Sequence, residues 1–154
     1  MEQVRQAKEL KRIENLQELL SWFDGAMYLK TRQSLARARL QQIKKQTPLT
    51  ESNAPADAYR LLDFFEHVAW LAEKGYVSAD DMWCAFYDPI IHLYADLEVL
   101  IKEERNAQTD NGIYAGLEKL VRKLYKVQTN QGQSPNKPNE PLIRRYYESN
   151  SALL

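Results

Sequence analysis

The segment from Asp57 to Gly75 constrains the fold of this chain most, because it is apolar around most of a helical circumference. At about 100° per residue, its apolar side chains form one wide stripe, which a helix can bury only with neighbours on several sides. Pro55 suits the start of a helix, and Gly75 suits the left-handed position that often follows a helix end. We therefore predict a central helix here. Its stripe comprises Ala58, Leu61, Leu62, Phe65, Val68, Ala69 and Ala72, with Phe64 and Leu71 on one flank and Tyr59 and Trp70 on the other.

The composition is that of an all-α protein with one domain. The chain has 154 residues, of which 44% are apolar and 27% charged, and these are ordinary globular values. Glycine is scarce, and good helix formers dominate the periodic segments. We predict a bundle of about four to five helices with a long N-terminal helix and a C-terminal tail. Residues 1–127 would form the bundle, 128–141 a polar flexible linker, and 142–154 a short docking segment or tail.

Residues 2–46 are helical in pattern but carry two apolar stripes that point in different directions. The first stripe ends at Met27 and the second begins at Leu29, so either the helix breaks near Gly25 or its two halves touch different partners. An unbroken helix of about 40 residues would be about 60 Å long, more than a domain of this size needs. We favour a long helix whose first part, within residues 1–28, overhangs the bundle and pairs with a partner.

Two places in the middle of the chain indicate where a helix begins and where one is interrupted. Ser78 is followed by two acids, which is typical of a helix N-cap and first turn. Asp88 and Pro89 then interrupt the next helical pattern. Because Asp can cap a helix and Pro is tolerated at a first helical position, this pair indicates either a kink or two helices in sequence.

Glu66 is the one residue that does not fit the central helix, because it lies on the flank of the apolar arc. A buried carboxylate needs a cation or several hydrogen-bond donors, or it stays protonated. Our first interpretation is an ion pair with Arg or Lys that ties two helices together. The alternatives are a general acid or base with a raised pKa, and a side chain that simply reaches water.

The residue patterns give little support to catalysis or metal binding. Asp88, His92 and Asp96 are spaced four residues apart on one helix, but the Glu-x-x-His spacing of carboxylate-bridged metal bundles is absent, and we interpret them as an exposed, salt-linked edge. The sequence has neither a Gly-x-Ser-x-Gly nucleophile motif nor a Gly-rich phosphate loop, and Cys84 reads as a small core residue. We predict that the chain is not an enzyme and uses no cofactor or metal.

The same residue usage indicates a cytoplasmic protein. A single cysteine excludes an intramolecular disulfide and fits a reducing compartment. The charged N-terminus does not resemble a signal peptide, and no apolar run approaches the roughly 20 residues that span a bilayer, so we expect no integral membrane segment.

Two apolar clusters lie near the ends of the chain and predict a protein partner. Such clusters usually dock on their own domain or on a neighbouring chain, and the Tyr and Arg residues of the second cluster are enriched in interface hot spots. The function that we predict is therefore a non-catalytic protein-interaction or structural module, self-associating as a homo-oligomer. The partner-binding candidates are Leu16, Leu20, Phe23, Met27, Leu142, Ile143, Tyr146 and Tyr147.

A basic helix face at residues 30–45 supports an alternative function, association with nucleic acid. Six cations and no acid lie between Tyr28 and Lys45. Lys30, Arg37 and Lys44 are seven residues apart and share one stripe, and such stripes engage phosphates. The neutral total charge, 21 Lys and Arg against 21 Asp and Glu, argues against a dedicated nucleic-acid binder.

One set of residues resembles a known family. It consists of the run Leu62–Glu66, then Ala69, Lys74, Gly75 and Phe86, the helix end from Leu97 to Arg105, and the run Ile113–Glu118. This pattern is similar to a family of small bacterial helical proteins described as a domain of unknown function. The resemblance implies a fold and no activity, and it makes Arg105 the first candidate partner for a structural ion pair with Glu66.

Overall fold

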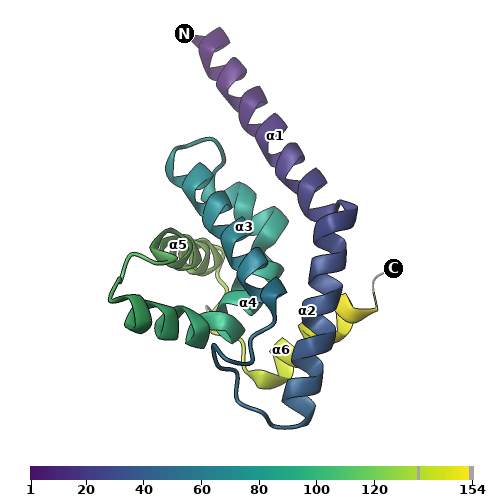
Figure 1. The fold of residues 1–154 in the computed structure, drawn as a ribbon. Helices are drawn as coiled ribbons and strands as arrows, with labels where there is room; N and C mark the ends of the chain where they lie inside the picture. The colour runs from purple at the N-terminus through teal and green to yellow at the C-terminus, as the bar shows by residue number, and fades with distance from the viewer. Residues whose placement is uncertain (135, 153–154) are drawn as a thin grey trace.

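The computed structural model describes residues 1–134 and 136–152, and these are folded entirely as helices and connecting turns (Figure 1). The helices are α1 (Glu2–Asp24), α2 (Ala26–Lys44), α3 (Ala56–Glu73), α4 (Ala79–Gln108), α5 (Ala115–Asn130) and α6 (Glu140–Ser151). The all-α prediction is confirmed. The expected four to five helices were too few, because the described residues form six.

Gly25 separates α1 from α2 and accounts for one of the additional helices. Its backbone is extended, with φ −66° and ψ 159°. A Cβ atom at this position would lie only 3.1 Å from the Ser21 carbonyl oxygen, so the absence of a side chain eases the break. The choice between one helix and two is thereby resolved in favour of two. The buried residues are Leu19 and Phe23 in α1, and Thr31, Leu35, Ala36 and Arg39 in α2.

Helix α3 is central, as predicted, and packs against α2, α4 and α5. Phe23 from α1 enters the same core, with its ring centroid 5.4–5.6 Å from those of Phe64, Phe65 and Phe86. Gly75 has φ 81°, the left-handed conformation expected after the helix end. The buried residues of α3 are Ala58, Leu61, Leu62, Phe64, Phe65, Val68 and Ala69.

Helix α4 begins at the predicted cap and continues through the predicted interruption. The Ser78 hydroxyl accepts a hydrogen bond from the Asp81 backbone N–H, and the Asp81 carboxylate accepts one from the Ser78 N–H, which is a complete capping box. Pro89 lies inside the helix, so the Asp88–Pro89 pair does not divide it into two helices. The buried residues of this single helix run from Met82 to Ile101.

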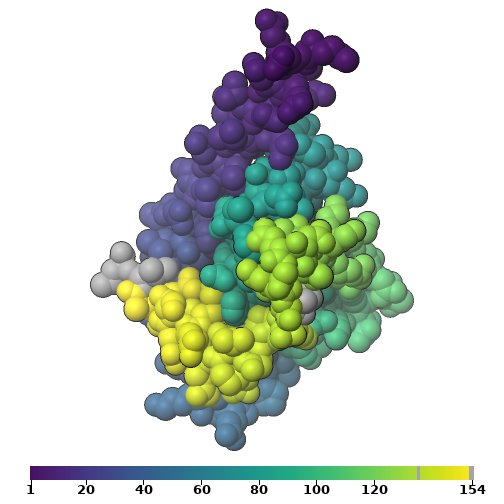
Figure 2. Space-filling view, turned by 180° about the vertical axis from the view of Figure 1, so that it is seen from behind, coloured from purple at the N-terminus to yellow at the C-terminus, as the bar shows by residue number. Residues whose placement is uncertain are grey.

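Helix α6 packs back on the bundle, against α2 and α4. In Figure 2 it lies next to the C-terminal end of α2 and the loop that follows. The predicted linker, 128–141, is partly helical, because α5 extends to Asn130 and α6 begins at Glu140. Between them, Lys137 pairs with Glu98 at 2.6 Å and Pro138 is buried. Pro135 of the linker and Leu153 and Leu154 of the tail lie outside the described residues.

Candidate functional site

Met1, which caps α1, and the first ten residues of the helix extend beyond the bundle. Figures 1 and 2 show these turns projecting past α3, and every residue from Met1 to Lys11 is exposed. Two contacts then attach α1, one to the turn between α3 and α4 and one to the first turn of α4. The Asn15 side chain donates a hydrogen bond to the Tyr76 carbonyl oxygen at 3.0 Å, and Arg12 pairs with Asp81 at 3.2 Å. The helix therefore consists of a free half and an attached half.

The Arg12–Asp81 contact couples this attachment to the cap of α4. Burial alone would raise the pKa of Asp81, but hydrogen bonds with Ser78 and with the Arg12 guanidinium outweigh burial and hold that pKa below its ordinary value. The carboxylate thus stays ionised at neutral pH and can hold both Arg12 and the Ser78 amide. The junction between α1 and α4 is in this way held by charge at the start of α4, in addition to the apolar contact between Phe23 and Phe86.

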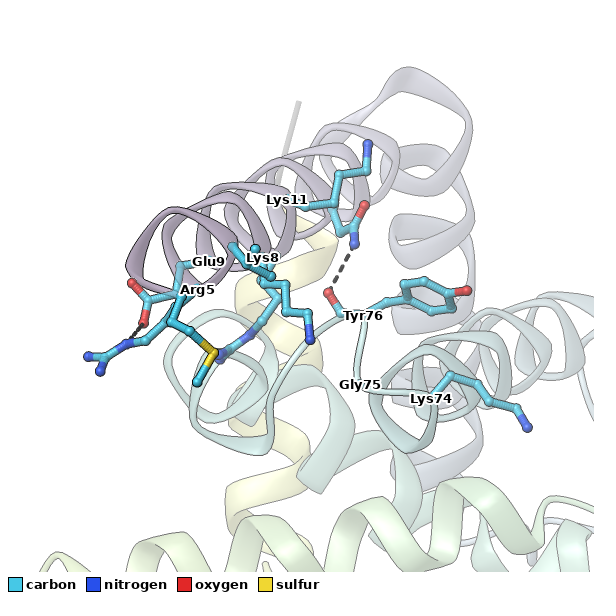
Figure 3. A pocket seen from close by; sticks show the side chains of 11 residues that line it. Arg5, Lys8, Glu9, Lys11, Lys74, Gly75 and Tyr76 are labelled. Atoms are coloured by element: carbon cyan, nitrogen blue, oxygen red, sulfur yellow. Dashed lines mark hydrogen bonds and ion pairs between the residues drawn. The ribbon is translucent and has the colours of Figure 1, made fainter.

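A groove of about 760 Å³ lies between the free half of α1 and the turn after α3 (Figure 3). Lys8 extends from α1 toward the turn. Asn15 and Tyr76, which are joined by a hydrogen bond between α1 and the turn, also line the groove. We call it the α1 groove. Its lining residues are Met1, Val4, Arg5, Lys8, Glu9, Lys11, Arg12, Asn15, Lys74, Gly75 and Tyr76.

The α1 groove is strongly basic. It is lined by five Lys and Arg side chains and by a single acid, Glu9. Three of the cations have acidic neighbours on the protein: Arg5 lies 3.8 Å from Glu9, Lys11 pairs with Glu14, and Arg12 pairs with Asp81. Lys8 and Lys74 form no ion pair within the described part of the chain. The groove therefore presents uncompensated positive charge to a ligand.

A second, smaller hollow of about 250 Å³ adjoins the groove and shares Asn15 and Tyr76 with it. We call it the aromatic hollow. Trp22 lines this hollow and Trp70 lies beside it, and the two residues are 49% and 48% exposed. Trp70 lies between His67 and Tyr76, with ring centroids 6.1 Å and 6.3 Å away. The hollow is lined by Asn15, Glu18, Leu19, Trp22, His67, Leu71 and Tyr76.

The exposure of Trp70 corrects our expectation that it would widen the buried arc of α3. Its ring packs beside those of His67 and Tyr76, and nearly half of the residue remains exposed. The ring therefore has neighbours on one side and solvent on the other. The excess width of the apolar arc of α3 was the signal in the sequence for this exposed ring, and we interpreted that width as additional buried surface.

The predicted partner-binding residues are divided by the structure. Phe23, Ile143 and Tyr147 are buried inside the chain itself, so their assignment to a partner surface was wrong. Their apolar contacts are made with the bundle because α1 and α6 both pack on it. Leu16, Leu20 and Tyr146 are half-buried against the same core, and Met27 and Leu142 are exposed.

The predicted basic face on α2 is narrower than the sequence indicated. Lys30, Arg37 and Lys44 are exposed and share a face with Ser34 and Gln41, a set that we call the α2 basic stripe. Two of the six cations do not contribute. Arg39 is buried, and Arg32 donates to the Phe23 carbonyl oxygen and stacks on the Phe23 ring at 4.0 Å.

Glu66 does not form the expected ion pair with Arg105. Its carboxylate accepts hydrogen bonds from the backbone N–H groups of Gly116 and Leu117, at 3.2 Å and 2.8 Å, at the N-terminus of α5. Arg105 instead binds Glu118 at 2.9 Å and the Ile113 carbonyl oxygen at 2.8 Å. Free amides and the positive end of the helix dipole replace the cation that we expected. Glu66 is therefore a cap for a neighbouring helix.

A buried polar network, which sequence reasoning missed, holds α6 in place. Arg39 binds Asp96 through two nitrogens at 2.7 Å and 2.8 Å, and the Tyr147 hydroxyl donates to Asp96 at 2.6 Å. The Arg39 and Asp96 side chains are only 6% and 9% exposed, so our interpretation of Asp96 as part of an exposed edge was wrong. Burial and the Asp96 carboxylate raise the pKa of Tyr147 well above its ordinary value, so the phenol stays a donor.

Metal-binding groups are not gathered at either surface feature. Within residues 1–134 and 136–152, no group of three or more His, Cys, Asp or Glu side chains is arranged to hold a metal ion. His92, one of the residues considered for such a site, stacks on Tyr146 with ring centroids 5.0 Å apart. The α1 groove and the aromatic hollow offer a ligand cationic hydrogen-bond donors, aromatic rings and aliphatic surface. These groups are suited to binding.

None of the described helices combines the length and apolar character needed to cross a bilayer. Comparison with curated proteins and with solved structures found no match. Comparison with protein-family models found one that covers residues 2–124, and it therefore includes the α1 groove except for Met1, the aromatic hollow and the capped end of helix α5. On this match, the chain belongs to the family described as a domain of unknown function, DUF4760.

Proposed function

We propose that the chain is a non-catalytic protein-interaction module that self-associates through α1. The observation that carries this proposal is the exposure of Leu10 and Ile13, which are 62% and 52% exposed on the free half of the helix and just beyond it. Burial of apolar surface contributes about 25 cal/mol per Å², so a partner that covers both side chains gains stability. An exposed apolar face on a projecting helix is typical of an interaction surface.

The exposed residues lie on a seam that runs the length of α1. Leu10, Ile13 and Leu20 alternate with Gln6 and Gln17 at spacings of four and three residues, which is the heptad spacing of a coiled-coil seam. Leu20 is half-buried against the core, so the seam continues from the free half of α1 to the bundle. A second helix could follow it along several turns.

The charge distribution along α1 favours a second copy of the same helix in the antiparallel direction. Basic residues outnumber acids in the first half, whereas the charged residues of the second half, after Arg12, are Glu14, Glu18 and Asp24. Antiparallel pairing places each basic half against an acidic half, and parallel pairing places like charges together. Such a pair has the two-fold symmetry that most homodimers share.

Light scattering coupled to size-exclusion chromatography tests self-association. We expect the wild-type chain to run with twice the mass of one 18.0 kDa chain, and the Leu10→Ser/Ile13→Ser variant to run as a monomer. Val99→Ser is the matched control, because Val99 is an exposed apolar residue on α4 and should not alter the mass. A monomeric wild type, or an unchanged dimer in the double variant, would contradict the proposal.

The α2 basic stripe supports a second candidate function, association with nucleic acid. Lys30, Arg37 and Lys44 form no ion pair within the described residues, and no acid interrupts the stripe. Each phosphate that the protein no longer neutralises should lower the slope of log K against log salt by about 0.9. We expect Lys30→Gln/Arg37→Gln/Lys44→Gln to lower both affinity and slope for a duplex, and Lys119→Gln/Lys126→Gln on α5 to change neither. Absence of salt-dependent binding by the wild type excludes this function.

A further inference from the structure

We propose that the α1 groove and the aromatic hollow together form a binding site for an acidic, amphipathic helix of a partner protein. This site does not depend on self-association. By helical periodicity, Val4, Lys8 and Asn15 lie on the side of α1 opposite to Leu10 and Ile13. A copy of the chain on the outer seam would therefore leave the inner face of α1 open.

Charge identifies the first property of the partner. Five cations line the groove against one acid. Lys8 reaches from α1 toward the turn after α3, whereas Lys74, on that turn, lies at the rim of the groove with its side chain directed away from α1. Carboxylates of a bound partner segment would pair with the cations of the groove that have no acidic partner within the described residues. Complementary charge of this kind speeds association and selects the sign of the partner.

The dimensions of the groove identify the second property. Its wall on α1 runs from Met1 to Asn15, which is about 20 Å of helix. A partner helix of about 14 residues has the same length, and two helices pack at interaxial distances of about 8–10 Å. The groove is therefore matched to about four turns of one helix laid beside α1.

The aromatic hollow identifies the third property, an apolar anchor. Its volume of about 250 Å³ is below the usual range for sites that enclose a drug-sized ligand, and it suits a single apolar side chain. Leu19 and Leu71 form its apolar lining, while Trp22 and Tyr76 border it with half-exposed rings. Aromatic residues around a small pocket are the usual composition of an interface hot spot.

The same lining favours a protein helix over a nucleic acid or a membrane. A partner helix can place its acids away from Glu9 in the groove and Glu18 in the hollow, whereas the continuous phosphate backbone of a nucleic acid cannot, and the α2 basic stripe carries no acid. A bilayer surface is flat and does not enter a hollow between two helices. An amphipathic helix can place its acids beside Lys8 and Lys74 and its apolar side chains against Leu71.

The test uses a synthetic peptide of about 18 residues, with Leu at helical spacing and Glu at the remaining positions. Binding is followed by the fluorescence of the exposed tryptophans and by calorimetry. We expect saturable binding that weakens with salt and that is at least about tenfold tighter than binding of the same peptide with Lys in place of Glu.

Variants locate the peptide on the protein. Lys8→Glu/Lys74→Glu should weaken binding by at least about tenfold, and Trp22→Ser should weaken it independently of salt. Lys126→Glu, a charge reversal at an exposed residue of α5, is the matched control and should leave affinity unchanged. Leu10→Ser/Ile13→Ser should also bind normally, which separates this site from the self-association seam. Circular dichroism of each variant checks that the fold is retained.

Four results would overturn the proposal. They are failure of the acidic peptide to bind, equal affinity for its basic counterpart, affinity unchanged by Lys8→Glu/Lys74→Glu in a folded protein, and loss of binding in Leu10→Ser/Ile13→Ser. Single-stranded DNA and vesicles that contain phosphatidylglycerol serve as competitors. If either one binds at Lys8 and Lys74 more tightly than the peptide, the site belongs to that ligand class and the proposal is wrong.

Discussion

At the scale of single residues, Glu66 shows how a buried charge is satisfied without an opposite charge. The first turn of α5 offers backbone N–H groups that have no partner within their own helix, and Glu66 accepts two of them. This explains why Arg105 is free to bind Glu118 instead. Every non-proline residue carries a backbone amide, so the sequence indicated that Glu66 needed a partner but gave no sign of which one.

Gly116 makes this arrangement testable. A Cβ atom at Gly116 would lie 2.7 Å from Glu66 Oε1, closer than such contacts occur in proteins. We expect Gly116→Ala to displace the carboxylate and to lower the free energy of unfolding by about 1–3 kcal/mol. Urea denaturation measures the effect. In a Glu66→Ala background the obstacle is gone, and Gly116→Ala should cost little or stabilise the helix; an equal loss in both backgrounds would contradict this account.

Glu118 predicts how stability depends on acid pH. The hydrogen bond from Arg105 holds the pKa of Glu118 below its ordinary value of 4.5, and Arg122 adds to the effect. The unfolded chain therefore takes up the proton first as the pH falls. The contribution of Glu118 to stability is complete above about pH 4.5 and is lost as the pH falls through the lower, folded-state pKa.

Glu118→Gln removes this contribution. We expect the variant to be less stable than the wild type at pH 7 and to lose less stability between pH 4.5 and lower values, because one of the linked carboxylates is absent. Urea denaturation at a series of pH values measures both effects. Parallel stability curves for the two proteins across the acid range would show that the Arg105–Glu118 pair does not contribute in this way.

At the scale of elements, α6 is attached to the bundle by a buried network as well as by apolar contacts. Asp96 on α4 accepts from both Arg39 on α2 and Tyr147 on α6, so one carboxylate connects three helices. Asp96→Asn leaves the Arg39 guanidinium buried without its counter-charge, and we expect it to cost about 3–5 kcal/mol. Tyr147→Phe removes one donor and should cost about 1–2 kcal/mol.

Thermal and urea unfolding of Asp96→Asn and Tyr147→Phe measure how much free energy of unfolding each variant loses. Glu98→Gln serves as a comparison, because its partners Lys102 and Lys137 are exposed and exposed pairs are weak. A loss in Asp96→Asn no larger than in Glu98→Gln would show that the network does not hold α6.

A helix could be predicted from the sequence where the pattern that specifies it is local. The central position of α3 and the start of α4 at Ser78 were predictable, because an apolar arc and a cap are local patterns. The two apolar stripes of residues 2–46 left one helix or two open, and only the packing of α1 and α2 decided it. The exposure of Trp22 and Trp70 was not predictable, because an apolar pattern along one helix does not show which of its side chains the other helices cover.

At the scale of the whole molecule, a packed bundle carries one projecting helix. The bundle buries α3 on several sides and holds α6 through Asp96, whereas the residues from Met1 to Lys11 are all exposed. The proposed seam for a second copy and the proposed site in the α1 groove lie on opposite sides of this projection. Under these two proposals, the bundle provides stability and the projecting helix provides interaction.

Hydrogen exchange of the α1 amides, measured across a range of protein concentrations, tests this division most directly. An isolated helical end frays, so in dilute protein we expect fast exchange at residues 2–11 and slow exchange around Leu19 and Phe23. As concentration rises, the amides of residues 2–11 should become protected, while those of the attached half change little. Exchange at residues 2–11 that stays the same at every concentration would contradict a role for the projecting half of α1 in self-association.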